Sequence, residues 1–438
     1  MFVVGWVLLL SLVIGVFLIL RNKNSSAPHN DYFSSLNRLL RQREPGYPVL
    51  LVDLDRVDHN IAMVKKHLGD TSRVRIAVKS LPCMSLIEYL MEKMGTQRVM
   101  AFHSPFALQM LRHFPKADLL IGKPFPVAVF TDFLERLEPQ EIAEISRIQW
   151  LVDTCERLSE YCEVAKRKKL TLNISIEVDV GLHRGGVGNF QEFDRVLLLL
   201  AHNREHLKLA GLMGYDAHIA KAPAFPGTGD KAREKEKVKV AKRFRGFTTY
   251  LRHKWPSLWS GELCLNGAGS YTYQMNTAND WGGYNDITIG SAFMKASDFD
   301  IPSLADHKPA LFIATRVLKK LDGLTIPYLE ALKPLFSALC KQGKTSFFIY
   351  GGWWMASVCS PVGLKTNSVY GRSTNQELLT THGFNGLEVD DYIFLLPSQS
   401  EFVMLQFGAI RALRGGAVVG EWPVLQQYPA REVDGCGE

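Results

Sequence analysis

Eight short apolar segments recur between residues 74 and 289, separated by stretches with the period of an α-helix, such as 84–94 and 191–203. The segments are rich in Val, Ile and Leu, as expected for strands buried on both faces of a parallel sheet. They occupy residues 74–78, 99–102, 118–121, 149–152, 172–178, 209–215, 263–266 and 286–289. The regular alternation of strand and helix places the chain in the α/β class. Eight repeats predict a (β/α)8 barrel (TIM barrel), although a doubly wound open sheet would show the same alternation.

The alternation stops near residue 310, where a second pattern begins. Strand-like runs without intervening helices follow at 311–318, 346–350, 392–396, 402–407 and 417–419. We therefore expect the barrel over residues 46–309 and a mainly β C-terminal domain over residues 310–438. Residues 21–45 are predicted to form a linker that becomes helical at 35–43.

The first 20 residues contain only Ser11 among apolar residues and glycines, and Arg21 and Lys23 follow directly. This length is what a helix needs to cross a bilayer. A cleaved signal peptide is the competing interpretation, but the basic start is missing and the apolar run is longer than usual. We therefore expect a membrane anchor at 1–20. Because the basic residues follow the span and none precedes it, the positive-inside rule places the globular part in the cytoplasm. The seven cysteines contain no CxxC pair, which fits a reducing compartment.

Polar residues follow the predicted strands, whose carboxyl ends meet on one face of a barrel. Lys79 stands directly after the first strand. A lysine is usually exposed, but an amine at the end of a buried strand is suited to form a Schiff base with an aldehyde cofactor. The later strand ends supply Arg184 after the fifth strand, Tyr215 and His218 after the sixth, Gly269 and Ser270 after the seventh, and Gly290 and Ser291 after the eighth.

The last two strand ends are rich in small residues with accessible backbone N–H groups, which suit a phosphate monoester. A single glycine-rich turn is weak evidence, since most such turns only reverse the chain. Two of them at the late strands, together with the lysine after the first, point jointly to pyridoxal 5′-phosphate as the cofactor.

Five segments of the chain resemble the fold-type III pyridoxal-phosphate enzymes. They are PVLLVDLDRVDHN at 48–60, RIAVKSLP at 75–82, EVDVGLHRGGV at 177–187, GLMGYDAH at 211–218 and DITIGSAF at 286–293. The branch they resemble contains D-threonine aldolase and D-serine dehydratase, whose barrel is related to that of alanine racemase. The match runs in order from about residue 46 to the end, and EVDVGxxRxGV is its most specific motif.

The resemblance implies a role for each strand-end residue. Lys79 would form the internal aldimine, and Arg184 and Tyr215 would lie beside the cofactor ring. Gly269, Ser270, Gly290 and Ser291 would neighbour the phosphate. His218 is kept as a candidate proton carrier. The family also has a β domain, joined by a strand near Val49, and builds its active sites at a dimer interface, so the resemblance implies a homodimer.

One loop departs from the family pattern. Residues 387–397 resemble the strand that precedes the metal loop of the aldolase and dehydratase branch, where a histidine and, two residues later, a cysteine or aspartate hold a divalent metal. This chain has Gln399 and Glu401 at those positions. An amide is a poor zinc ligand, while Glu401 still offers an oxygen to a hard cation. The sequence therefore disfavours a metal site of the family type, and His382 stays a candidate ligand or proton carrier.

The resemblance implies lyase chemistry on a small amino acid, most simply a D-β-hydroxy amino acid. An amino-acid racemase of the same fold is one alternative. Another is a regulatory protein that binds the cofactor but has lost catalysis, for which the changes at Gln399 and Glu401 are the main argument. A purely structural membrane protein is disfavoured by the density of matched strand-end residues.

Residues 231–254 hold ten Lys or Arg against two Glu, in a chain whose net charge is +7. The simplest interpretation is a solvated helix of the barrel. With an anchor nearby, the sharper hypothesis is that this helix faces anionic lipid headgroups. Nucleic-acid binding is not expected, because no recognised motif accompanies the charge.

Overall fold

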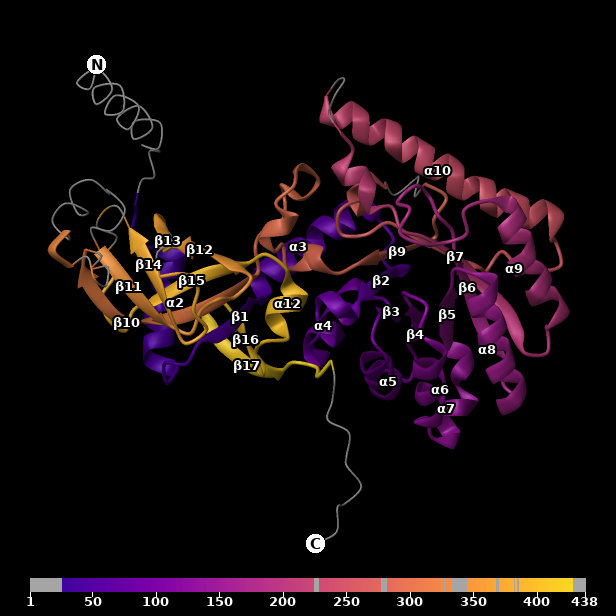
Figure 1. Ribbon diagram of the computed structural model, residues 1–438, viewed down its shortest axis with the longest axis horizontal. Coiled ribbons are helices and arrows are strands. Elements are labelled where there is room, and N and C mark those ends of the chain that lie inside the picture. Colours follow the sequence, from indigo (N-terminus) through magenta and orange to yellow (C-terminus); the bar gives the residue numbers. More distant parts are fainter. Residues whose placement is uncertain are drawn as a thin grey trace, which may run out of the picture. The chain divides into compact units, whose positions relative to one another are not determined.

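In the computed structural model, the described residues are 26–223, 228–276, 282–323, 325, 328, 330–332, 345–367, 370–381, 383 and 386–427. Their contacts divide them into two compact units (Figure 1). The smaller unit comprises the residues up to 48 together with 313–395, and the larger comprises 49–312 together with the residues from 396 onward. The predicted anchor at 1–20 lies outside the described residues. Among those that are described, no helix is long and apolar enough to cross a bilayer.

The described part of the larger unit contains eight parallel strands that close into a barrel. They are β2 (Val74–Ala77), β3 (Arg98–Ala101), β4 (Asp118–Ile121), β5 (Ile148–Val152), β6 (Leu172–Glu177), β7 (Leu207–Gly214), β8 (Cys264–Gly267) and β9 (Asp286–Ile289). Each strand pairs with the next, and β9 pairs with β2, so the barrel has no free edge. The predicted barrel is therefore confirmed, and the open sheet is excluded.

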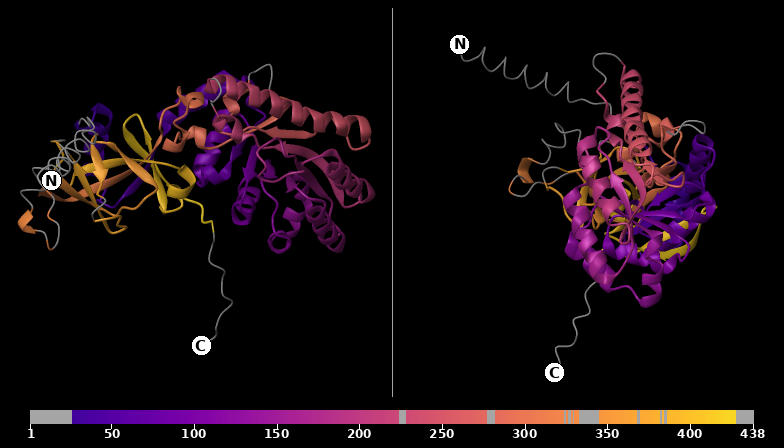
Figure 2. Two further views of the ribbon diagram at one scale, coloured as in Figure 1. Left: turned by 45° about the horizontal axis from the view of Figure 1, so that its top comes forward. Right: turned by 90° about the vertical axis from the view of Figure 1, so that its right-hand side faces the viewer.

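Helices lie outside the barrel strands (Figures 1 and 2). They include α3 (Leu54–Leu68), α4 (Met84–Met94), α5 (Ser104–His113), α6 (Val127–Glu135), α7 (Pro139–Ala143), α8 (Cys155–Lys168), α9 (Phe190–His202) and α10 (Gly229–Lys254). Their apolar residues recur at helical spacing and are buried, as Leu86, Leu90 and Met94 are in α4. One face of each strand lies against the barrel interior and the other against the helices. Because both faces are covered, the strand sequences are largely continuous apolar runs.

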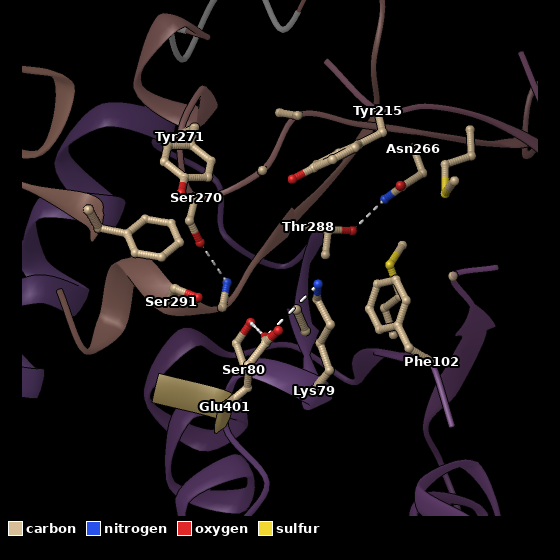
Figure 3. A pocket seen from close by; sticks show the side chains of 18 of the residues that line it. Lys79, Ser80, Phe102, Tyr215, Asn266, Ser270, Tyr271, Thr288, Ser291 and Glu401 are labelled. Atoms are coloured by element: carbon tan, nitrogen blue, oxygen red, sulfur yellow. Dashed lines mark hydrogen bonds and ion pairs between the residues drawn. The ribbon is translucent and has the colours of Figure 1, made fainter. Parts of the chain in front are cut away.

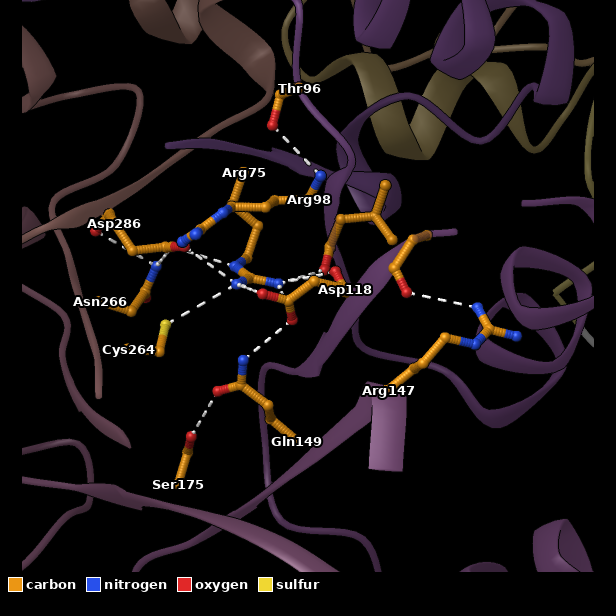
Figure 4. A network of polar contacts seen from close by, with 12 residues as sticks. Arg75, Thr96, Arg98, Asp118, Arg147, Gln149, Ser175, Cys264, Asn266 and Asp286 are labelled. Carbon is orange, nitrogen blue, oxygen red and sulfur yellow. Dashed lines mark hydrogen bonds and ion pairs between the residues drawn. The ribbon is translucent and has the colours of Figure 1, made fainter. Parts of the chain in front are cut away.

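A buried ion cluster fills the amino-terminal end of the barrel interior (Figure 4). The side chain of Arg75 is 0% exposed and donates to Asp286 (Nη2 to Oδ2, 2.9 Å) and to Asp118 (Nη2 to Oδ2, 2.9 Å). Arg98 also donates to Asp286 (Nη1 to Oδ2, 2.7 Å). Burial opposes the charge of Arg75, yet the two carboxylates raise its pKa well above the usual value. Burial likewise favours neutral Asp286, but the two guanidiniums lower its pKa.

An apolar layer lies between this cluster and the carboxyl ends of the strands. Met100, Leu120, Leu151 and Met213 pack together there, and Phe102 packs against them. Met100 and Met213 also line the cavity that opens at the carboxyl ends. The ion cluster and the apolar layer therefore form the floor on which the cavity rests.

The larger unit also contains a small group of strands from the two ends of the chain. Strand β1 (Val49–Asp53), the strand expected near Val49, pairs in parallel with β16 (Ala409–Arg414), which pairs antiparallel with β17 (Ala417–Pro423). The strand predicted at 402–407 is wrong, because helix α12 (Ser400–Met404) begins just before it. Adjacent Val403 and Met404 are both buried, and so short an apolar run does not distinguish a helix from a strand.

The smaller unit is mainly β, as predicted for the residues after 310. Its strands are β10 (Leu311–Asp322), β11 (Thr345–Tyr350), β12 (Ala356–Ser360), β13 (Leu364–Thr366), β14 (Gln376–Thr381) and β15 (Tyr392–Pro397), the first and last of which extend into the larger unit. Four of them follow the antiparallel order β13, β14, β11, β10, and β15 pairs with β10. Helix α2 (Asp31–Arg43) includes the predicted helix and starts earlier, because Asn30 caps its first turn.

Replacing Arg75 by methionine tests whether the ion cluster supports the barrel. Arg75→Met leaves the buried carboxylate of Asp286 with Arg98 alone and removes the arginine partner of the partly exposed Asp118, so we expect the free energy of unfolding to fall by about 3 kcal/mol. The matched control is Arg136→Met, which removes an ion pair with Asp132 on the surface and should cost about 0–1 kcal/mol. Urea unfolding followed by circular dichroism measures both. Equal, small losses for the two variants would contradict a supporting role for Arg75.

Candidate active site

A cavity of about 220 Å³ opens at the carboxyl ends of the barrel strands (Figure 3). Its wall is built from the residues that follow β2, β3, β6, β7, β8 and β9, and from α12. Parallel strands bring these ends together although the residues are far apart in sequence, which is the usual position of a barrel active site.

Lys79 projects into this cavity from the short helix η1 (Val78–Ser80), which follows β2 directly. All four residues of β2 are buried, so the backbone at Lys79 is firmly placed. Its Nζ lies 4.9 Å from the centre of the Phe102 ring and 3.9 Å from Glu401 Oε2. The side chain is 39% exposed, so the amine is accessible from the cavity rather than sealed in the core.

The loops after β8 and β9 converge on one hydroxyl group. Ser270 Oγ accepts hydrogen bonds from the backbone N–H groups of Gly290 and Ala292, each at 3.1 Å. A Cβ atom at Gly290 would lie 2.8 Å from Cβ of Ser80, and one at Gly269 would lie 3.0 Å from the Tyr215 ring. Gly290 therefore lets its loop approach the lysine loop, and Gly269 lets its loop approach the Tyr215 ring. Gly269, Ser270, Gly290 and Ser291, predicted together from sequence, all line the cavity.

Arg184 and Tyr215 form another part of the wall. The guanidinium carbon of Arg184 lies 4.7 Å from the centre of the Tyr215 ring. Burial raises the pKa of Tyr215 to about 12, although Arg184 opposes the shift, so the phenol is neutral. Sequence reasoning placed these two residues beside each other, and the structure brings both to the cavity.

A tight turn after β6 presents Arg184. Asp179 Oδ1 accepts the backbone N–H groups of Gly181 (2.9 Å) and His183 (3.1 Å), and Asp179 Oδ2 lies 2.6 Å from His183 Nδ1. Gly186 has φ +95°, and a Cβ there would lie 2.8 Å from the backbone nitrogen of Asp179. The Asp and Gly residues of the EVDVGLHRGGV segment therefore fix the turn that aims its arginine.

Helix α12 supports the lysine loop. Ser400 Oγ donates to the backbone carbonyl of Ser80 at 2.8 Å, and Ser80 Oγ donates to Glu401 Oε2 at 3.4 Å. The carboxylate of Glu401 is thus directed at Lys79 (Figure 3). Gln399 also lines the cavity, and its Nε2 donates to Asp298 at 3.3 Å. In the described part of the chain, no three His, Cys, Asp or Glu residues are grouped to hold a metal; His382 lies outside that part.

The predicted proton carrier His218 does not line the cavity around Lys79. It belongs to the short helix η3 (Ala217–Lys221), which turns it toward α10, where its Nε2 lies 3.7 Å from Glu236 Oε1. Burial lowers the pKa of His218, with Glu236 opposing the shift. Tyr215 and His218 both line a neighbouring hollow beside the cavity, but only Tyr215 also lines the cavity around Lys79.

Several cavity residues were not predicted as site residues, among them Phe102, Asn266, Tyr271 and Thr288. Asn266 Nδ2 donates to Thr288 Oγ1 (2.8 Å) and to Asp286 Oδ1 (2.6 Å), which ties the cavity wall to the ion cluster below it. For Phe102, Asn266 and Thr288, the available signal was an inward-facing position at or near the end of a predicted strand. Tyr271 carries no such signal, since it follows the strand by several residues.

The fold and site define a closed (β/α)8 barrel with a lysine amine and a two-loop N–H cradle in one cavity. Residues 52–276 match the family model of the alanine racemase N-terminal domain, and the chain belongs to that family. A comparison with curated proteins found no match.

Solved structures of three enzymes show the same fold. D-threonine aldolase from Filomicrobium marinum is 18% identical with a TM-score of 0.65, covering 86% of this chain and 96% of its own. D-threo-3-hydroxyaspartate dehydratase from Delftia sp. HT23 is 14% identical with a TM-score of 0.63, covering 89% and 99%. Alanine racemase from Bacillus anthracis with bound L-Ala-P is 15% identical with a TM-score of 0.62, covering 86% and 97%. The resemblance to fold-type III pyridoxal-phosphate enzymes is confirmed.

Glu177, at the end of β6, makes the stability of the barrel depend on pH. Burial raises its pKa from 4.5 to about 7, although Arg184 opposes the shift. The folded state therefore binds this proton more tightly than the unfolded state, and stability falls as pH rises from 4.5 through 7. We expect Glu177→Gln to remove about 2–3 kcal/mol of the loss in unfolding free energy between pH 5 and pH 8.

Urea unfolding at the two pH values measures this effect. Exposed Glu163 on α8 provides the control, since Glu163→Gln should keep the wild-type pH dependence. An identical pH dependence for wild type and Glu177→Gln would show that the buried carboxyl is not the source.

Proposed function

We propose that this chain is a pyridoxal-phosphate-dependent enzyme that acts on small amino acids, with Lys79 as the residue that binds the cofactor covalently. The observation that carries the proposal is that one cavity is lined both by Lys79 and by the two small-residue loops after β8 and β9, which the backbone N–H groups of Gly290 and Ala292 join by donating to Ser270 Oγ. An amine that reacts with an aldehyde and a cradle for a phosphate are the two features that this cofactor requires of a protein.

The residues present fit the cofactor in further respects. Gly269 and Gly290 keep the cradle open, since a Cβ at either position would contact a neighbouring side chain at 3.0 Å or less. The backbone N–H groups of Gly290 and Ala292 both donate to Ser270 Oγ, so the loop after β9 directs two donors toward the loop after β8. Arg184 and Tyr215 provide a cationic and an aromatic surface beside the cavity. When bound, pyridoxal phosphate would delocalise negative charge that develops on the substrate.

The chain's own residues then have distinct roles. Lys79 Nζ supplies the reactive amine, and the contacts of Ser400 and Glu401 with the lysine loop hold that amine toward the cavity. Phe102, Tyr271 and Phe299 make the wall largely apolar, which excludes water and leaves room for a small side chain. Glu401 also places a carboxylate where a β-hydroxyl or a hard cation can be bound. The chelator experiment below tests whether a divalent metal contributes to the reaction.

We favour lyase chemistry on a D-β-hydroxy amino acid over racemisation. The support is the likeness of the whole fold to D-threonine aldolase and D-threo-3-hydroxyaspartate dehydratase. An alanine racemase with a similar TM-score makes the racemase a real second candidate. We also propose that the chain forms a homodimer. Residues 1–20 would anchor it in a membrane, with the barrel in the cytoplasm.

The first prediction concerns the cofactor. Purified protein supplied with pyridoxal phosphate should show an absorption band at about 410–430 nm, and Lys79→Ala should abolish it because the amine is gone. Lys123→Ala is the matched control, since Lys123 is exposed on the loop after β4 and should leave the band intact. A colourless wild-type protein would overturn the proposed cofactor.

The second prediction concerns the reaction. Incubation with D-threonine should give glycine and acetaldehyde if the chain is an aldolase, or 2-oxobutanoate and ammonia if it is a dehydratase. A racemase would change only the configuration at Cα. Lys79→Ala should lower turnover by about 10²-fold or more, and a parallel assay with chelator shows whether a metal contributes. No turnover of any amino acid, with the absorption band present, would instead favour a non-catalytic cofactor-binding protein.

A further inference from the structure

The faces of helix α10 carry different kinds of side chain. The face toward the barrel buries Val240, Phe244, Phe247 and Leu251. This apolar face is fully used in packing, so the helix has no second apolar face to insert into a partner. Figures 1 and 2 show the helix lying along the outside of the barrel.

The basic residues at the sides of α10 are paired with carboxylates. The pairs are Arg233 with Asp230, Lys237 with Glu234 (3.9 Å), Lys239 with Glu236 (2.6 Å), Arg243 with Asp179 (3.6 Å), and Lys254 with Asp194. These residues stabilise the helix and its attachment to the barrel, as expected of a solvated helix.

The face opposite the barrel is different. It carries Lys231, Lys235, Lys242, Arg245 and Arg252, here called the basic stripe, and all five are exposed. At 3.6 residues per turn they fall within about 100° of the circumference and extend over about 30 Å. Exposed Val238 and Thr249 complete the row.

Part of the basic stripe has no compensating charge. Lys231, Lys235, Lys242 and Arg252 form no ion pair with any residue that the structure describes. Like charges three or four positions apart, such as Lys231 and Lys235, destabilise a helix. The like charges of the stripe therefore destabilise the helix, whereas the paired residues at its sides stabilise it.

We propose that the basic stripe binds the anionic headgroups of a lipid bilayer. A straight row of exposed cations suits a flat, negatively charged surface, and the helix would lie on the bilayer without entering it. The apolar run at 1–20, followed by Arg21 and Lys23, would hold the barrel within reach of such a surface. A single nucleic-acid strand fits less well, since the aromatic rings beside the stripe, Phe190 and Tyr250, already stack on each other at 4.5 Å.

Lysine acetylation of the full chain, read by mass spectrometry, tests the proposal. Lys231, Lys235 and Lys242 should be protected in vesicles that contain phosphatidylserine and not in pure phosphatidylcholine vesicles, and high salt should remove the protection. Exposed Lys116 and Lys169, elsewhere on the barrel unit, should be labelled equally in both vesicles.

A double variant adds a second measurement. Lys235→Gln with Lys242→Gln removes two stripe charges and should reduce the protection of Lys231 at least about ten-fold. Lys65→Gln with Lys66→Gln removes two exposed charges from α3 and should leave that protection unchanged.

Equal labelling of the stripe in both kinds of vesicle would overturn the proposal, and so would protection by RNA or duplex DNA but not by anionic vesicles. Flotation with phosphatidylcholine vesicles reports on the anchor alone. Failure of the anchor is therefore distinguishable from failure of the stripe, and neither result depends on the chemistry at Lys79.

Discussion

The buried pairing of Arg75 with Asp118 and Asp286 is the constraint on which the rest of the barrel depends. These charges come from β2, β4 and β9, so their contacts join β2 to its neighbour β9, where the barrel closes, and past β3 to β4. Removing Arg75 would leave the core carboxylate of Asp286 with Arg98 alone, which is more costly than losing a surface ion pair. Asn266 extends this network upward to Thr288 in the cavity wall, so the floor and the site are held by one set of contacts.

Above that floor, the site combines a lysine amine with two small-residue loops, which we propose bind a phosphate. Lys79 follows a fully buried strand, and its loop is fastened to α12 through Ser400. The cradle depends on glycines at close approaches and on hydrogen bonds between the two late loops. Such placement on strand ends is more exact than placement on free loops, which fits a site where an amine and a phosphate must be held at a fixed separation.

The sequence was sufficient to predict the barrel and part of the cavity lining, because both follow from the order of buried strands and the residues after them. Lys79, Arg184, Tyr215 and the two glycine loops were predictable in this way. His218 was not, since the direction of a side chain after a strand depends on the turn, and η3 directs it toward Glu236. Residues 402–404 belong to a helix where a strand was predicted over 402–407, because a short apolar run has no clear period. The elevated pKa of Glu177 depends on burial, which one segment alone does not reveal.

The central claim is that Lys79 holds pyridoxal phosphate, and chemical trapping tests it most directly. Protein supplied with the cofactor is reduced with borohydride, digested and examined by mass spectrometry, which locates the modified lysine among all those in the chain. The account predicts one phosphopyridoxyl group on the peptide that contains Lys79. A group located on another lysine, or no modified peptide at all, would contradict it.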